Sequence, residues 1–593
     1  MIATGAARGT LPHGVLTGRG TTLPVIYEVG QAEGRPFFAL ELTAYRGGSD
    51  TIAPRGHGSR AHGVLKPRQV AGADLVTLRA SDLGYRSRIT DADGIVVYPP
   101  RLTNGFQISR DMALSPNGDG AGSSYGSSIL GNLDGAFDAF LTSYNVDGRP
   151  MRILAGVQSY EYRRGIFLDP PRAELATIFA GFSKPWVIGQ DDIQVPLRDA
   201  SYLIEAAIQG EAFAGTGTGT LEGSADMKGR KKPRARGGSA EAPIRNVSGV
   251  WVDQVDGILQ FSDTYGLVVT LSENGDSAQI QFQGVYQDTD PHGVAVLPGH
   301  YSVFSNAAGL FVKLGSVTSG TITADIVGAF PDGAIRSTAA AVALEILRQD
   351  LQVPEEWIAA STFAGLDASR PWIAGEHWDG TADVQGVDAV GIFLRSLGAR
   401  MIPGRDGRLR AVPLRPNAAG DVPIARYGPA EIVSVTPVPL PDSVWPLRYR
   451  FPVGYLRNHT VFGESDVDPD VTGANLDWIK QEWLTAAAFS AAGLRAYGRP
   501  QEADLVQTAL LRQEDAQTLA AELVELWGQD EGEMPPICYD VELPLRFVMR
   551  HEIGERLILT YPMANLRAGV MAGVVGDTMS ATSSTATLRV LVS

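Results

Sequence analysis

Cysteine is almost absent from this chain of 593 residues, since Cys538 is the only one. A lone cysteine excludes intramolecular disulfides and cysteine-rich zinc sites. Apolar runs are short as well: none approaches the length of about 18 residues that a membrane-spanning helix needs, so no such helix is expected. Residues Met1 to Gly14 have no apolar core of the kind found in secretory signals. We therefore expect synthesis in a cytoplasm and no export through a cleaved signal.

Positive charge is also scarce. The chain has 50 lysines and arginines against 66 aspartates and glutamates, which gives a net charge of −16. A protein that grips nucleic acid neutralises phosphates and is usually basic, so tight DNA binding is not expected. An acidic surface would suit a tube through which DNA slides, because like charges repel.

The residues that are abundant indicate a β-rich protein with large cores. Hydrophobic residues make up 44% of the chain, and 68 glycines are scattered through it, which is typical of many tight turns between short strands. A length of 593 residues predicts roughly four domains. Because helical patterns are a minority and no long-period repeat is present, we predict a β-rich α+β fold.

Changes in pattern divide the chain into five segments. Phe37 to Tyr45 is the only firm strand near the N-terminus. The predicted segments are an N-terminal arm with loops at 1–70, a first domain at 71–212, a β-rich domain with a basic loop at 213–335, a helix–helix–hairpin domain at 336–430, and a C-terminal β-rich domain with an amphipathic helix at 431–593.

Turn dipeptides give the clearest local predictions. Asp256-Gly257 and Asp406-Gly407 predict hairpins, and Asn274-Gly275 predicts that strands 266–271 and 278–282 continue one sheet. Apolar periodicity predicts helices at 132–141, 202–208, 339–347, 387–394 and 516–527. Alternation predicts a half-buried strand at 537–545, and 588–592 is expected to close a sheet.

Motifs with a catalytic appearance fail their structural requirements. Gly122 to Gly126 fits the G-x-S-x-G pattern, but loop residues precede it where a nucleophile elbow needs an apolar strand. His551-Glu552 begins an H-E-x-x-H pattern, but the second histidine is missing and Gly554 interrupts the helix that zinc binding needs. Glu376 to Asp379 suggests a sugar site, for which the sequence cannot establish two carboxylates across a cleft. No catalytic residue and no cofactor is therefore predicted.

Four aspartates resemble a calcium loop. Asp466, Asp468, Asp470 and Asp477 occupy its positions 1, 3, 5 and 12. Val471 stands where the loop needs glycine, and Pro469 stiffens its middle. We therefore interpret this stretch as a solvated acidic loop and predict no metal site.

One dense basic run stands out against the acidic background. It lies in K-G-R-K-K-P-R-A-R, and a loop of this kind could contact DNA, lipopolysaccharide phosphates or an acidic partner, or could simply be exposed. The residues of this possible interaction loop are Lys228, Arg230, Lys231, Lys232, Arg234 and Arg236. Since no other cluster supports chemistry, a structural or assembly role is favoured.

Several segments resemble the tail-tip or baseplate hub proteins of long-tailed bacteriophages and gene-transfer agents. Leu83 to Leu102 carries the resemblance, together with G-N-L-D-G-A-F-D, D-G-R-P-M-R-I-L-A-G, F-A-G-F-S-K-P-W and V-P-L-R-D-A-S-Y. Met227 to Arg234 matches a family segment that precedes a strand pair. The similarity covers roughly 75–420, with a weaker echo in Ala520 to Pro562.

The resemblance implies several β-barrel-like hub domains with short helices, which assemble as a ring, commonly a homotrimer, at the distal end of the tail tube in the virion. It implies contacts with a distal tail protein, a tape measure protein and a central spike or fibre protein. It also implies production in the bacterial host cytoplasm, a transient meeting with the host envelope, and passage of DNA through the lumen without specific binding during genome ejection.

Two other functions remain open from the sequence. The first is a receptor-binding or fibre-attachment protein that uses loops in 1–70 or 213–243. The second is a tail-associated cell-wall hydrolase, which needs two close carboxylates or a metal.

Overall fold

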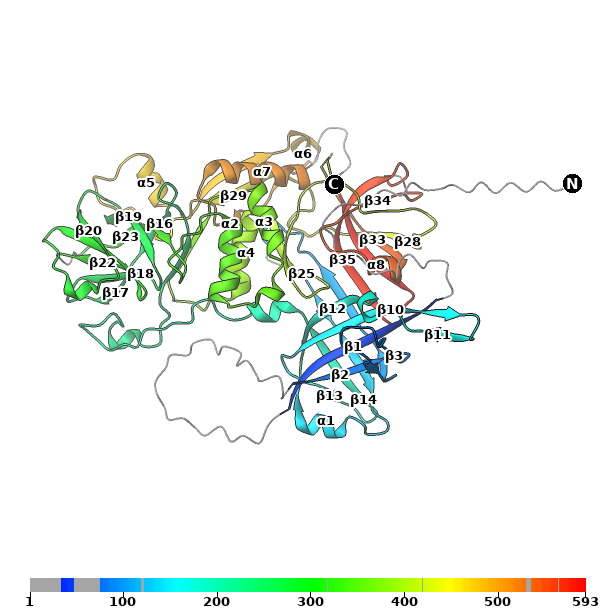
Figure 1. The fold of residues 1–593 in the computed structure, drawn as a ribbon. Helices are drawn as coiled ribbons and strands as arrows, with labels where there is room; N and C mark the ends of the chain where they lie inside the picture. Colours follow the sequence, from blue (N-terminus) through cyan, green and yellow to red (C-terminus); the bar gives the residue numbers. More distant parts are fainter. Residues whose placement is uncertain are drawn as a thin grey trace.

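The computed structural model describes residues 34–46, 75–118, 122–316, 318–418, 420–496, 498–528, 535–563 and 565–593. Strands outnumber helices, and the fold is β-rich α+β as the sequence predicts. Figure 1 shows three bodies: a terminal body made from both ends of the chain, a central body that carries the long helices, and an outer β body. Within the described ranges, no helix is both long and apolar enough to cross a bilayer.

Two sheets that share one apolar core form the terminal body. The first sheet contains β1 (Gly34–Arg46), β2 (Leu75–Ser81), β5 (Leu102–Asn104), β8 (Ser127–Gly131), β9 (Tyr144–Asn145), β10 (Pro150–Glu161), β11 (Ile166–Leu168), β12 (Ala176–Ser183), β13 (Val187–Ile188) and β14 (Asp192–Arg198). The second contains β6 (Gln107–Asp111), β7 (Ser124–Tyr125), β27 (Ala425–Tyr427), β28 (Ser434–Val438), β33 (Ile537–Pro544), β34 (Arg556–Leu559), β35 (Val570–Ser580) and β36 (Thr585–Val592). A two-stranded ribbon, β3 (Tyr85–Arg86) and β4 (Val97–Tyr98), lies beside β2.

The strand pairing crosses two of the predicted domain boundaries. β1 lies between β2 and β10, so a boundary at residue 70 separates a central strand from its sheet. β6 pairs with β35, which joins the predicted first domain to the C-terminal one. Long-range pairing of this kind leaves no mark on local composition. Residues 1–33 and 47–70 of the predicted arm, and 71–74 of the predicted first domain, lie outside the described ranges.

The central body packs helices against short sheets around one large core. Its elements are α2 (Ala339–Glu345), the π-helical turn η7 (Ile346–Asp350), α3 (Ala360–Ser369), α4 (Gly386–Ser396), β25 (Ala399–Pro403), β26 (Leu409–Pro413), β29 (Arg448–Tyr455), β30 (Leu484–Phe489), α6 (Ala491–Ala496), β31 (Gln501–Glu502), β32 (Val506–Gln507) and α7 (Gln513–Trp527). α7 buries Leu519, Ala520 and Leu523 in this core, as its apolar stripe predicts.

Two five-stranded sheets make up most of the outer body. One contains β15 (Arg234–Gly237), β16 (Ile244–Ser248), β19 (Gly266–Glu273), β23 (Ile322–Gly328) and β24 (Gly375–Trp378). The other contains β17 (Val250–Asp253), β18 (Ile258–Ser262), β20 (Gln281–Gln287), β21 (His300–Asn306) and β22 (Gly309–Leu314). The prediction that the strands flanking Asn274-Gly275 continue one sheet is wrong, because β19 pairs with β23 and β20 runs parallel to β21. Buried Ile280 lies in the core that the two sheets share, where the chain crosses between them.

Other local predictions are confirmed where turn chemistry decides the structure. Gly257 and Gly407 adopt the positive φ that a tight turn requires (φ +69° and +79°), and the predicted hairpins β17–β18 and β25–β26 form around them. β33 alternates as predicted, and β36, which contains 588–592, lies in the interior of its sheet between β33 and β35 instead of closing it.

Two predicted helices are shorter than their apolar spacing suggests. The helix predicted for 132–141 begins only at Asp138 (α1, Asp138–Ser143), because Gly135 has φ +64° and the Asn132 side chain accepts the Phe137 N–H at 2.9 Å. The helix predicted for 202–208 is a single 3₁₀ turn, η4 (Ala200–Ile204). The remaining short helices are η3 (Arg172–Glu174), η5 (Ala225–Met227), η6 (Pro291–Gly293), η8 (Glu355–Trp357), α5 (Ala474–Ile479) and α8 (Leu545–Val548).

A buried ion cluster joins the terminal and central bodies. Asp577 on β35 accepts from Arg110 on β6 at 2.5 Å and from Arg405 in the β25–β26 turn at 3.0 Å. Glu552 accepts a hydrogen bond from a second nitrogen of Arg110 at 3.0 Å. Burial alone would lower the pKa of Arg110, but the Asp577 and Glu552 carboxylates raise it above its usual value. The two carboxylates, Asp577 and Glu552, therefore balance the two guanidinium groups of Arg110 and Arg405.

We expect Asp577→Asn to destabilise the protein strongly. The substitution leaves two buried guanidinium groups without their shared carboxylate, and the loss of one partner of a buried ion pair costs about 3–5 kcal/mol. Thermal unfolding followed by circular dichroism measures the change. The matched control is Asp134→Asn, whose pair with Arg101 lies at the surface (28% and 58% exposed for the Arg101 and Asp134 side chains) and should change the thermal midpoint far less. Equal effects of the two substitutions would contradict a joining role for the cluster.

Candidate functional site: the basic segment 228–236

The basic segment is divided between the surface and the interior. Lys228 and Arg230 are exposed, and Lys231 is half-buried. Lys232, Arg234 and Arg236 are buried, with Arg236 fully enclosed. The expectation of one exposed loop is therefore wrong for these last three residues, because Arg234 and Arg236 begin and continue strand β15. A partner for the remaining exposed residues stays a prediction.

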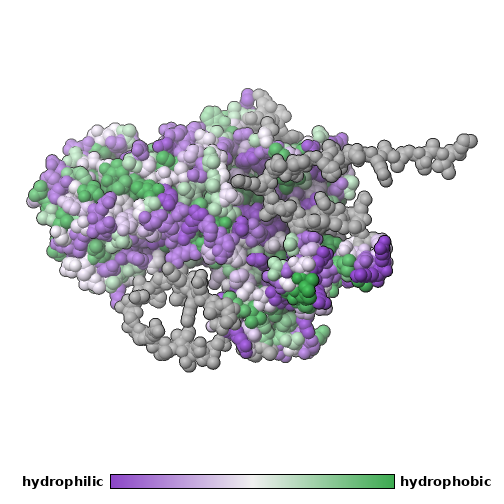
Figure 2. All heavy atoms as spheres, in the orientation of Figure 1, coloured by the Kyte–Doolittle hydropathy of each residue, from purple (hydrophilic) through white to green (hydrophobic). Residues whose placement is uncertain are grey.

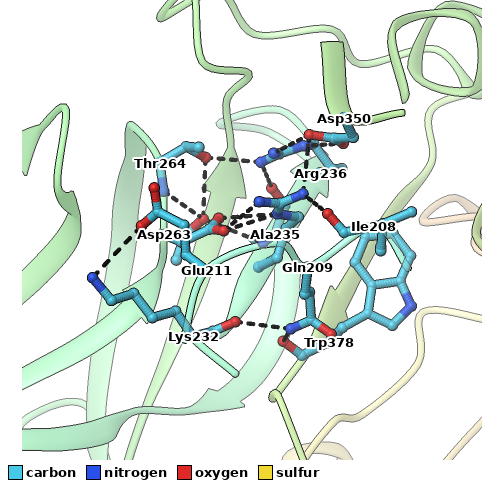
Figure 3. Close-up of polar contacts among 12 residues, drawn as sticks. Ile208, Gln209, Glu211, Lys232, Ala235, Arg236, Asp263, Thr264, Asp350 and Trp378 are labelled. Atoms are coloured by element: carbon cyan, nitrogen blue, oxygen red, sulfur yellow. Dashed lines mark hydrogen bonds and ion pairs between the residues drawn. The ribbon is translucent and has the colours of Figure 1, made fainter. Parts of the chain in front are cut away.

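Arg236 joins the outer body to the central body. Its Nε and Nη2 donate to the two carboxylate oxygens of Asp350 at 2.9 and 2.7 Å, which is a bidentate pair. Its Nη1 donates to the Ala329 carbonyl at 2.9 Å and to the Thr264 hydroxyl at 2.8 Å. Asp350 is the last residue of the π-helical turn η7, so the pair links a strand to the end of a helix (Figure 3).

Arg234 uses the same aspartate and a second one. Its Nη1 lies 3.2 Å from Asp350 Oδ1 and also donates to the Ile208 carbonyl. Its Nε donates to both Asp263 oxygens at 3.1 and 3.0 Å. Burial by itself would lower the pKa of Arg234, but Asp263 and Asp350 raise it above the usual value. Two guanidinium groups face two carboxylates, so the buried part of the segment is neutral and offers no charge to an anion.

Lys232 and Gln209 extend this network toward the surface (Figure 3). The Lys232 ammonium contacts Glu222 at 3.0 Å and Glu211 at 3.6 Å. Gln209 donates to the carbonyls of Lys232 and Trp378, at 2.8 and 3.2 Å. These contacts hold the incoming chain against β24, the partner strand of β15.

Strand β24 carries a second buried polar group. Glu376 accepts from Arg457 at 2.8 Å and lies 3.8 Å from His459, while His377 lies 3.2 Å from the Phe261 carbonyl. Burial raises the pKa of Glu376. Burial lowers the pKa of His377 to about 4 and, with His377 and Arg457 nearby, lowers that of His459 well below its ordinary value. Glu376 and His377 therefore serve the interior instead of an open sugar site.

Neither catalytic motif forms a reaction centre. Ser124 lies in the short strand β7, with no helix after it. His551 is buried between Tyr427 and Glu555, at 2.7 and 3.1 Å, and Glu552 belongs to the Arg110 cluster. The stretch is a turn before β34, as the sequence predicts.

The four aspartates of the suspected calcium loop are not gathered together. Asp468 and Asp470 approach Asp276, while Asp477 lies in helix α5. The Asp468 side chain accepts from the Asp470 N–H at 2.9 Å and from Gln279 at 2.7 Å. The Asp468–Asp470–Asp276 group is made only of carboxylates and lies toward the surface, in keeping with a solvated acidic loop.

Sequence reasoning missed the acidic partners of the buried arginines. Asp263 follows strand β18 within Ser-Asp-Thr, and Asp350 ends a helical stretch. A lone aspartate after a buried strand is the one local signal available, and it also marks ordinary turns.

Comparisons with known proteins give structural similarities at low identity. No family model and no curated protein matches the chain. The tail protein of Neisseria meningitidis MC58 is 10% identical with a TM-score of 0.33, covering 86% of this chain and 95% of its own. A 43 kDa tail protein of prophage MuSo2 from Shewanella oneidensis is 9% identical (TM-score 0.32; 84% and 95% covered). Prophage tail protein gp18 of Listeria monocytogenes is 9% identical (TM-score 0.30; 85% and 94% covered). Because TM-scores below 0.5 do not establish a common fold, the proposals below rest on this chain's residues and geometry.

We expect Arg236→Met to lower the thermal midpoint and to loosen the outer body. The change leaves Asp350 with only the more distant guanidinium of Arg234, and breaking a buried pair costs about 3–5 kcal/mol. Unfolding monitored by intrinsic fluorescence, with limited proteolysis between the bodies, measures both effects. Arg230→Met is the control, since Arg230 is exposed and its replacement should change the free energy of unfolding by about 0.5 kcal/mol or less. An unchanged thermal midpoint in Arg236→Met would contradict the conclusion that Arg236 joins the outer body to the central body.

Mild acid should destabilise the protein through His377 and His459. An unfolded imidazole takes up a proton near pH 6.5, whereas folded His377 does so only near 4. The unfolded state therefore binds more protons between these values, so stability present above pH 6.5 is lost as the pH falls toward 4. The expected loss is on the order of 2–3 kcal/mol for His377.

The pH effect is measured as the difference in unfolding midpoint between pH 7 and pH 5. His459→Gln should flatten this dependence, because one buried histidine no longer titrates. His300→Gln, at a partly exposed position in the outer body, is the matched control and should keep the wild-type slope. If the midpoint of His459→Gln changed with pH as much as that of wild type, the proposed role of the buried histidines in acid destabilisation would be contradicted.

Proposed function

We propose that the chain is a structural subunit of a bacteriophage tail tip, a baseplate hub protein that forms a ring at the distal end of the tail tube. The ring, commonly a homotrimer, would join the tube to a central spike or fibre and let DNA pass on ejection. Its neighbours would be a distal tail protein and a tape measure protein. The sequence resemblance across residues 75–420 is the starting point for this proposal.

The observation that supports it most is where the ionisable clusters lie. Among the described residues, the two most buried groups of arginines and acids both join one body of the chain to another, through Asp577 and through Asp350. Their charges are compensated internally and are enclosed by apolar cores. Such an arrangement fixes the shape of a subunit and leaves its outer surfaces available for neighbours.

Those outer surfaces carry apolar residues at both ends of the molecule. Phe282 and Val285 are each 54% exposed on β20, which lies at the edge of its sheet. On the terminal body, Val187 and Ile188 of β13 are 53% and 61% exposed. Figure 2 shows hydrophobic atoms gathered over the outer body and again over the lower part of the terminal body. An edge strand with exposed apolar side chains is suited to pairing with another chain, and we assign β20 to contact with a second copy.

The negative net charge of −16 suits the proposed lumen. DNA passing through a ring is repelled by an acidic wall and is not retained by specific contacts. The exposed Lys228 and Arg230 and the half-buried Lys231 would then face a protein neighbour or the host envelope, where phosphates or acidic side chains are available.

Oligomerisation of the purified full chain tests the proposal. We expect a defined ring in negative-stain images and a mass above that of the 63.1 kDa monomer by light scattering. Phe282→Asp with Val285→Asp should shift the mass toward the monomer without lowering the thermal midpoint. Val422→Asp, which places a charge at an 80% exposed apolar position away from β20, is the control and should keep the ring.

Three results would overturn the hub proposal. A monomer at all concentrations that produces a lysis band on peptidoglycan gels would favour the tail-associated hydrolase. A monomer that binds the surface of host cells would favour receptor binding. Labelled antibody bound anywhere other than the distal end of the tail in intact particles would contradict the proposed position.

A further inference from the structure

Three side chains from two turns of the outer body converge on one point. Asp253 ends strand β17, Asp256 lies in the β17–β18 turn, and His292 lies in the short 3₁₀ turn η6. The Nε2 atom of His292 is 3.4 Å from Asp253 Oδ2 and 3.9 Å from Asp256 Oδ2. Nitrogen and oxygen ligands of a single ion with bonds of about 2.0–2.1 Å lie roughly 3.3 Å apart in tetrahedral geometry. The cluster has nearly this spacing.

The Asp290 carboxylate orients the imidazole of His292 through the ring nitrogen that faces away from Asp253 and Asp256. Its Nδ1 lies 3.0 Å from the Asp290 carboxylate, which favours the proton on Nδ1 and leaves a lone pair on Nε2. A carboxylate behind a histidine in this way fixes the ring and increases its basicity toward a metal. The Nε2 atom itself is enclosed and makes no hydrogen bond, although two carboxylate oxygens are close. A buried nitrogen without a hydrogen bond requires a partner, and a cation would supply it.

Backbone N–H groups hold the side chain of Asp253 in place. Its side chain is 1% exposed, and its Oδ1 accepts the N–H groups of Val255 and Asp256 at 2.9 and 3.1 Å. Its Oδ2 accepts the Gly219 N–H at 2.6 Å. These three backbone donors fix the position of the carboxylate before any ligand arrives.

We propose that Asp253, Asp256 and His292 bind one divalent first-row transition-metal ion, with Asp290 as the positioning residue behind His292. One imidazole with two carboxylates suits Zn²⁺, Co²⁺ or Mn²⁺ better than Mg²⁺ or Ca²⁺, which prefer oxygen ligands throughout. Asp256 is 44% exposed and gives the ion a path from solvent, and a water completes the coordination. The ion would tie the β17–β18 turn to η6 and, through Asp253, to the glycine-rich stretch that contains Gly219.

The surface aspartates Asp276, Asp468 and Asp470 provide a useful contrast. They also come within ligand distance of one another, but they offer only oxygens and lie toward solvent. Lacking a nitrogen ligand and a positioning carboxylate behind it, they are the internal control for weak, nonspecific binding of cations to acidic groups.

The test uses the full chain stripped of metal with a chelator and titrated with Co²⁺, which reports coordination by its visible absorption. We expect saturation at one equivalent per chain, displacement by Zn²⁺, and a higher thermal midpoint with either ion. His292→Gln and Asp256→Asn should abolish the saturable absorption, and Asp290→Asn should weaken binding by about 10–100-fold. Circular dichroism of the metal-free variants verifies that they fold.

The matched controls are His300→Gln, another histidine of the same body, and Asp468→Asn in the all-carboxylate group. Both should bind one Co²⁺ as wild type does. The proposal is overturned if wild type shows no saturable Co²⁺ absorption, if folded His292→Gln keeps it, or if Asp468→Asn removes it.

Discussion

One buried carboxylate shared by two arginines holds each junction of this molecule together. Asp350 binds Arg234 and Arg236 where the outer body meets the central body. Asp577 binds Arg110 and Arg405 where the terminal body meets the central body. In each junction a second acid, Asp263 or Glu552, completes the balance of charge. Without that balance each buried charge would cost several kcal/mol. The arrangement of the bodies therefore depends on the two arginines and two acids of each junction coming together.

The sequence predicts elements well where local chemistry decides them. The hairpins at Gly257 and Gly407 follow from residues that tolerate positive φ, and α7 follows from its apolar stripe. The β-rich α+β class follows from the same patterns. Prediction fails at 132–141, where Gly135 and the Asn132 side chain override the apolar spacing. It also fails after Asn274-Gly275, because an identical turn serves a hairpin or a crossing between sheets, and only the distant partners β21 and β23 decide which.

The basic segment shows the same limit for the candidate site. A run of lysines and arginines resembles a solvated loop, because charge density alone does not reveal where the counter-charges lie. Asp350 is more than a hundred residues from Arg234 and Arg236 in the sequence, and Asp263 follows a strand that pairs elsewhere. The resemblance of Met227 to Arg234 to a family segment before a strand pair agrees with β15. It does not predict that the arginines are buried.

Ion pairs suit these junctions better than a larger apolar contact would. Apolar surfaces attract without a fixed direction, so two bodies joined only by them can slide by a residue at small cost. A bidentate guanidinium–carboxylate pair has a fixed geometry and tolerates no such shift. In a ring, an error in the angle between bodies is repeated in every subunit, and the ring closes only if that angle is constant. The buried pairs of Asp350 and Asp577 therefore fix the angle between the bodies, which is the property that the proposed hub subunit would need from its interior.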